Sequence, residues 1–196
     1  KYKGSVILEG NMMGTVGKSR LKSIPEIVAV SVAIALSGFH LLTALYGTLS
    51  PMIQRFVHLF GALLLTFLLY DSKGQRRKGS TALSRWSLAL AVVTAILGVY
   101  MIYEFNPDAV LNRGIWGISE LEQWTGLLLM ILVLEATRRT VGWPLVIVAL
   151  VALAYAFLGP YLPQAIAHKG YDMWRLVETL SWTTEGILGI PMAASA

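Results

Sequence analysis

Long apolar stretches separated by short polar breaks dominate the chain from residue 25 onward. A transmembrane helix needs about 20 apolar residues to cross about 30 Å of hydrocarbon. Four stretches satisfy this requirement or come close to it, and they predict membrane-spanning helices over 27–49, 52–70, 86–103 and 141–158. The polar break at 48–51 is so short that the first two helices must form a tight antiparallel hairpin.

A further span is harder to place because its charge-free run, from Trp124 to Leu134, is too short to cross a bilayer alone. The run becomes long enough if the helix occupies about 118–137, which puts Glu120 and Glu122 at the membrane interface. A re-entrant segment is the alternative, and we consider it the weaker one.

Beyond Pro163 the pattern becomes that of an amphipathic helix. Aspartate is a residue type that caps helix N-termini, and clusters of apolar residues alternate with charged ones after Asp172. A helix of this kind lies in the membrane interface rather than across the bilayer. We therefore expect an interfacial helix over 172–182, with four candidate interface residues: Asp172, Trp174, Arg175 and Trp182.

The composition supports a membrane protein. Hydrophobic residues make up 56% of the chain and charged residues 14%, whereas about 25% of residues are charged in an average soluble domain. The net charge of +5 would suit nucleic acid, but the cations flank the apolar stretches, where they orient helices and face lipid headgroups. We expect no nucleic-acid partner. The absence of cysteine excludes disulfides, thiolate catalysis and cysteine metal sites.

The basic residues fall mostly on one side of this topology. Twelve of the 16 Lys and Arg residues precede the first span, surround the break after the second, or follow the span at 118–137. The opposite side carries four basic against seven acidic residues. Basic loops stay in the cytoplasm during insertion, so we expect an integral membrane protein with a cytoplasmic N-terminus. The expected fold is all-α, with about five transmembrane helices and a periplasmic interfacial amphipathic helix.

Cysteine labelling tests this topology, which places loops 71–85 and 138–141 inside and loops 104–120 and 160–185 outside. The chain has no native cysteine, so any labelling comes from the single cysteine that is introduced. Asn112→Cys should react with an impermeant maleimide added on the periplasmic side, and Gln75→Cys should not. The reverse labelling pattern would contradict the topology.

The first 24 residues are expected to form a cytoplasmic tail. Its segment from Met12 to Ser19 is similar to a phosphate-binding loop, but Met12 replaces the first glycine of that motif and no nucleotide domain has room there. At the other end, Pro191 suits the first turn of a helix that does not follow. We expect the chain to be part of a longer polypeptide.

His40 and His58 are the candidate cofactor residues. They lie at similar distances from the hairpin turn, so at about 1.5 Å per residue they reach similar depth on adjacent helices. Two imidazoles at equal depth suit haem ligation, with Arg55 near a propionate. We favour the alternative, that each histidine hydrogen-bonds within the bundle or faces an interface, because no further motif supports haem. A haem-binding redox subunit using both histidines is the second hypothesis for the function.

Glu135, Arg138 and Arg139 form a charged group near one span end. The arginines follow Glu135 by three and four residues, so both can pair with it along one helix. A coupling-ion or gating site is one interpretation. We favour a structural anchor, in which the arginines hold the inner helix end through Glu135 and lipid headgroups. With no catalytic dyad and no metal-ligand spacing, we expect neither an enzyme nor a cofactor.

Four stretches of the sequence are similar to one transporter family. They are Leu134-Glu-Ala-Thr-Arg-Arg-Thr-Val-Gly-Trp-Pro144, Phe157-Leu-Gly-Pro-Tyr-Leu-Pro163, His168-Lys-Gly-Tyr171 and Thr183-Thr-Glu-Gly-Ile-Leu-Gly-Ile-Pro191, and the early segment Gln54-Arg-Phe-Val-His-Leu59 also fits. Together they resemble the N-terminal part of the fused permease of a tripartite ATP-independent periplasmic (TRAP) transporter, in the branch served by TAXI-type binding proteins. The resemblance covers about 25–196.

The resemblance implies a division of labour between a scaffold, the Q region, and a larger M region that holds the substrate and coupling-ion sites. Residues 25–137 would form the four-helix scaffold, 138–163 a linking transmembrane helix, and 164–196 the interfacial helix and the start of M. A periplasmic binding protein would deliver the substrate, and a sodium or proton gradient would drive uptake. Because nearly all of M lies outside this sequence, no transport-site residue is expected here.

Overall fold

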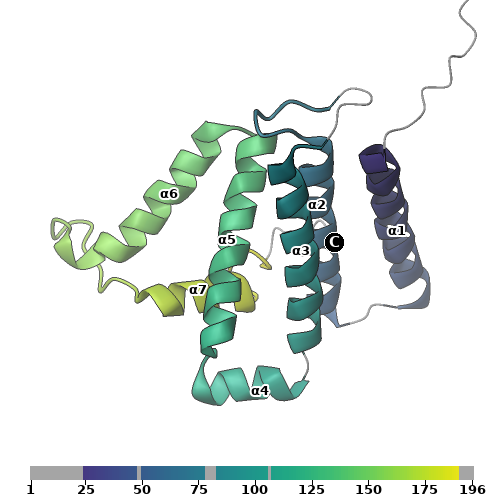
Figure 1. Cartoon of the computed structure of the whole chain (residues 1–196). Coiled ribbons are helices and arrows are strands. Elements are labelled where there is room, and N and C mark those ends of the chain that lie inside the picture. Colours follow the sequence, from purple (N-terminus) through teal and green to yellow (C-terminus); the bar gives the residue numbers. More distant parts are fainter. Residues whose placement is uncertain (1–23, 48–49, 78–82, 106, 190–196) are drawn as a thin grey trace, which may run out of the picture.

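The computed structural model describes residues 24–47, 50–77, 83–105 and 107–189, and this part of the chain is mainly helical (Figure 1). It contains no strand, and its one β-type contact is an isolated bridge between Tyr70 and Arg76. The expected cytoplasmic tail, apart from Ile24, lies outside the described residues.

Among the described residues, four helices are long and apolar enough to cross a membrane. They are α1 (Ile24–Tyr46), α2 (Pro51–Leu69), α3 (Arg85–Glu104) and α6 (Trp143–Leu158), which continues as the 3₁₀ turn η1 (Gly159–Tyr161). Their ends fall within three residues of the predicted ones. The prediction of an all-α membrane fold is thus confirmed for the described part of the chain.

The helix α5 (Glu120–Thr140) corresponds to the span that was hard to place. Its 21 residues run without interruption, antiparallel to α3 (Figure 1), and at about 1.5 Å per residue they can cross a bilayer. The helix does not reverse within these residues, as a re-entrant segment would, but it is not among the four helices apolar enough to span a membrane, so its crossing of the bilayer stays a prediction. The predicted inner loop at 138–141 is mostly wrong, since α5 continues through Thr140 and carries Arg138 and Arg139 in its last turn.

A helix that the sequence analysis missed, α4 (Pro107–Trp116), lies across the end of the bundle between α3 and α5 (Figure 1). A loop over 104–120 was predicted because the segment from Glu104 to Asp108 has the residues of a turn. The fixed φ and missing N–H of proline suit the first turn of a helix, and α4 begins at Pro107.

The centre of the bundle is α2, which packs against α1, α3 and α5. Apolar side chains such as Phe56, Leu63 and Phe67 are buried there. In the most hydrophobic window of α2, 44% of residues are buried inside the chain, against 11% in α1 and in α6. These two peripheral helices therefore turn apolar side chains outward.

Candidate functional site

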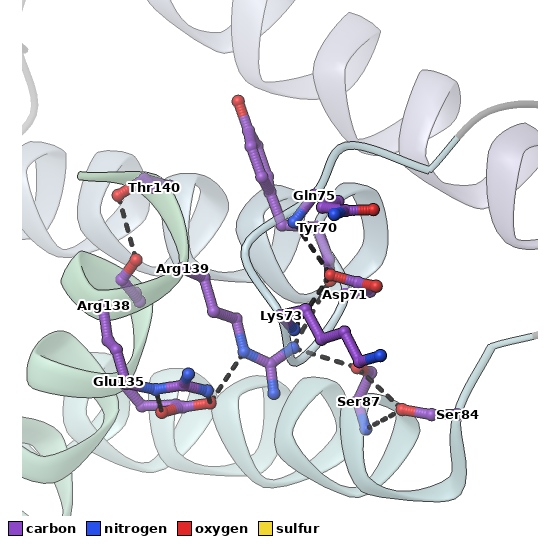
Figure 2. A network of polar contacts seen from close by, with 11 residues as sticks. Tyr70, Asp71, Lys73, Gln75, Ser84, Ser87, Glu135, Arg138, Arg139 and Thr140 are labelled. Carbon is purple, nitrogen blue, oxygen red and sulfur yellow. Dashed lines mark hydrogen bonds and ion pairs between the residues drawn. The ribbon is translucent and has the colours of Figure 1, made fainter. Parts of the chain in front are cut away.

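The first candidate comprises Glu135, Arg138, Arg139, Ser87 and the carbonyl of Tyr70 (Figure 2); we call it the inner cluster, after the side of the membrane expected from the sequence. Glu135 Oε2 accepts a hydrogen bond from Arg138 Nε at 2.7 Å. Its Oε1 accepts from Arg138 Nη2 at 2.8 Å and from Arg139 Nε at 2.7 Å. The predicted pairing of one carboxylate with both arginines is thus confirmed, and the cluster keeps a net positive charge.

The Arg139 guanidinium joins three helices. Its Nη1 donates to Ser87 Oγ in the first turn of α3 at 2.9 Å and to the Tyr70 carbonyl at the end of α2 at 3.4 Å. The guanidinium carbon also lies 5.2 Å from the ring centre of Phe67. Nη2 is buried without a hydrogen-bond partner, so Glu135 supplies the main electrostatic compensation for this buried charge.

The two arginines differ in exposure. The Arg138 side chain is 22% exposed and lies 5.7 Å from the ring centre of Trp143, whereas the Arg139 side chain is fully buried. The expected contact with lipid headgroups is therefore wrong for Arg139, which binds only protein groups. For Arg138 it stays a prediction.

The second candidate, the outer cluster, comprises Arg113, Glu122, Phe105, Trp182 and the carbonyl of Glu104. Arg113 Nε pairs with Glu122 Oε1, and Arg113 Nη2 donates to the Glu104 carbonyl at 3.0 Å. The guanidinium carbon lies 4.4 Å from the Trp182 ring centre and 5.6 Å from that of Phe105. One buried cation thus holds α4 to the ends of α3 and α7 and the start of α5.

Sequence analysis did not single out this cluster, although part of it leaves a local signal. Ser119 and Glu122 form a capping box: Ser119 Oγ accepts from the Glu122 amide, and Glu122 Oε2 accepts from the Ser119 amide at 2.7 Å. A serine followed three residues later by glutamate is a recognisable start of a helix. The pairing of Glu122 with Arg113 depends on α4 and has no such signal.

The helix predicted over 172–182 is present as α7 (Met173–Trp182), and its position in the membrane interface stays a prediction. Asp172 caps it as predicted, accepting from the Trp174 amide at 3.0 Å. Trp174 packs edge-on against Trp124 of α5, and Arg175 is exposed. Trp182 was expected at the interface but is buried, and its Nε1 donates to the Glu122 carbonyl at 2.9 Å. The end of α7 therefore packs into the helix bundle.

The segment after α7 also returns to the bundle. Leu188 is fully buried, and its carbonyl accepts from Arg55 Nη1 of α2 at 2.7 Å. Arg55 had been considered as a partner for a haem propionate, and the structure gives it a backbone carbonyl instead.

The histidine pair lies at the depth that the hairpin geometry predicts. His58 Nδ1 and His40 Nε2 are 3.0 Å apart, so the two imidazoles hydrogen-bond directly. This contact leaves no room for a porphyrin between them. His40 Nδ1 also lacks the acceptor that usually orients an iron-bound histidine. The residues therefore do not fit a haem held by both imidazoles; a stoichiometric Soret band lost in His40→Ala would contradict this conclusion.

Polar residues line the cavities beside the outer cluster, whereas the cavity among the long helices is apolar. Two cavities of about 520 and 460 Å³ adjoin the outer cluster and share Arg113. A third, of about 350 Å³, lies among α1, α2 and α3 and is lined almost entirely by apolar residues, Gly61 and Gly98 among them. Among the described residues, no group of three or more His, Cys, Asp or Glu side chains is placed to hold a metal ion.

No family model, curated protein or solved structure matches this chain.

Proposed function

We propose that the chain is the membrane scaffold of a TRAP-type secondary transporter, which takes up a substrate delivered by a periplasmic TAXI-type binding protein. The proposal starts from the resemblance of the stretches at 134–144, 157–163, 168–171 and 183–191 to the Q region and its junction with M. One structural observation supports it most: the inner and outer clusters lie at the two ends of the bundle and bind groups of the chain itself.

The region between the two clusters suits packing rather than transport. A substrate or coupling-ion site within the membrane needs ionisable groups, polar groups or unwound backbone. Here α2, α3 and α5 are continuous, and the cavity beside α2 and α3 is apolar. The two histidines are paired with each other. A rigid scaffold has these properties.

The proposed partners follow from the surfaces of the bundle. The outward apolar faces of α1 and α6 would pack against lipid and against the M region, which would hold the substrate and the sodium ion or proton. The binding protein would dock on the outer side, where acidic residues outnumber basic ones. We place the protein in the bacterial inner membrane with its N-terminus in the cytoplasm.

Reconstitution tests the proposal. Proteoliposomes that contain this chain and the binding protein should show no gradient-driven uptake, because the proposal assigns the transport site to M. Uptake should appear when M is supplied, fused or separately, and should be lost again when this chain is omitted. Uptake by the chain and the binding protein alone, or uptake by M without the chain, would contradict the scaffold assignment.

A further inference from the structure

The loop 159–171, which connects α6 to α7, is organised around the imidazole of His168. The ring packs against Gly159, where any side chain would overlap it. The Tyr155 ring lies 4.7 Å away and the Tyr171 ring 5.8 Å away, centre to centre. Two of the stretches that carry the family resemblance, 157–163 and 168–171, therefore pack against each other here.

The hydrogen bonds of His168 assign its protonation state. Its Nε2 lies 3.0 Å from the carbonyl of Tyr155, which can only accept, so Nε2 carries a proton. The Gly170 amide donates to Nδ1 at 3.1 Å, so Nδ1 offers its lone pair. The loop thus requires a neutral imidazole. The bond to Tyr155 also caps one of the last four carbonyls of α6, which have no partner within the helix.

We infer that His168 is a proton-sensitive latch between the end of α6 and the start of α7. Protonation of Nδ1 turns an acceptor into a donor that faces the donating amide of Gly170, so this hydrogen bond must break. Glycine suits the moving position: Gly170 has a φ of +74°, and a Cβ there would lie 2.7 Å from Pro160 Cδ.

The surrounding groups determine which side of the latch opens. From α6, the ring of Tyr155 and the C-terminal end of the helix face the imidazole. Both stabilise a positive charge, the ring through its π face and the helix end through its dipole. From the loop, Tyr171 faces the ring and the neighbouring Lys169 is exposed, while Gly159 and Pro160 of η1 bear no charge. The imidazolium therefore keeps its bond to Tyr155 and releases the Gly170 amide.

The release occurs two residues before the N-cap of α7. The hydrogen bond from the Tyr171 amide to the Ala156 carbonyl, at 3.0 Å, is then the remaining contact with α6 that lies next to the N-cap of α7. Acidification of the side that bears this loop would loosen the tether to α7, whose own packing against α5 does not involve His168. This inference does not depend on the transport proposal.

Imidazole nitrogen NMR on the unmodified chain in lipid nanodiscs tests the assignment directly. With ¹⁵N-histidine, the signals that disappear in His168→Gln should show Nε2–H and unprotonated Nδ1 at about pH 8, and both protonated at about pH 5. An Nδ1–H tautomer for neutral His168 would overturn the proposal without any further variant.

Hydrogen exchange tests the release. Amide exchange in a peptide that covers 168–172, corrected for the intrinsic pH dependence, should become about tenfold faster between about pH 8 and about pH 5, which corresponds to losing about one hydrogen bond. His168→Gln keeps polar atoms but cannot be protonated, so its corrected exchange should not change with pH. Equal pH responses in the two proteins, or no response in the unmodified chain, would overturn the latch.

Discussion

Glu135→Leu is expected to destabilise the protein by about 3–5 kcal/mol, because it leaves the buried Arg139 guanidinium without a counter-charge. No other carboxylate pairs with this guanidinium among the described residues, and one of its nitrogens already lacks a hydrogen bond. Arg138→Ala should cost only about 0–1 kcal/mol, since Arg138 is partly exposed and its loss leaves Glu135 paired with Arg139. Thermal unfolding in detergent, followed as the fraction of monodisperse protein, measures both.

A double variant separates charge burial from packing. Arg139→Met keeps most of the side-chain volume and removes the buried charge, so Glu135→Leu should cost much less in that background. If Glu135→Leu destabilised the unmodified protein and the Arg139→Met variant equally, the explanation from charge burial would be contradicted. Normal stability of Glu135→Leu, combined with loss of uptake in a reconstituted transporter, would favour the coupling-site interpretation.

Features set by neighbours along the chain were predictable from the sequence. The spans follow from apolar runs, the Asp172 cap from residue type, and the pairing of Glu135 with both arginines from helical spacing. The similar depth of His40 and His58 also follows from the short hairpin, whereas their direct hydrogen bond was not predicted.

Features that need contacts between distant segments were not predictable. Nothing in the sequence distinguishes Arg138 from Arg139, although only the side chain of Arg139 points at Ser87 of α3. The burial of Trp182 depends on Arg113 and Glu122, which lie 60 or more residues earlier.

The glycines illustrate the same limit. Small residues in membrane helices permit close approach of neighbours, and Gly61, Gly98 and Gly126 do lie against other side chains. Around Gly38 and Gly47, by contrast, no side chain of the described residues comes within 4 Å of the position that a Cβ would take. A glycine therefore permits close packing, but whether a neighbouring helix packs there cannot be predicted from the residue type.

Gly126→Ala is expected to detach α7 partly from α5. At this crossing a Cβ would lie 2.8 Å from Val177 Cγ1, 3.1 Å from Trp182 Nε1 and 3.2 Å from Ser181 Cβ. Two short hydrogen bonds hold the crossing. Ser181 Oγ donates to the Gly126 carbonyl at 2.9 Å, and Trp182 Nε1 donates to the Glu122 carbonyl, one helical turn earlier in α5. Overpacking such a contact costs about 1–3 kcal/mol, so amide exchange in α7 should become about tenfold faster or more.

Removing the methyl group that the new Cβ meets should reverse the effect. Val177→Ala eliminates Cγ1, so α7 exchange in the Gly126→Ala, Val177→Ala double variant should be slower than the two single effects predict together. Gly38→Ala is the matched control, because a helical glycine with open space around it gains a methyl group without a clash. Its α7 exchange should equal that of the unmodified chain. The segment after α7 is held to α2 by the hydrogen bond from Arg55 to the Leu188 carbonyl. Additive effects of Gly126→Ala and Val177→Ala on exchange would mean that this segment positions α7, and not the crossing of α7 with α5.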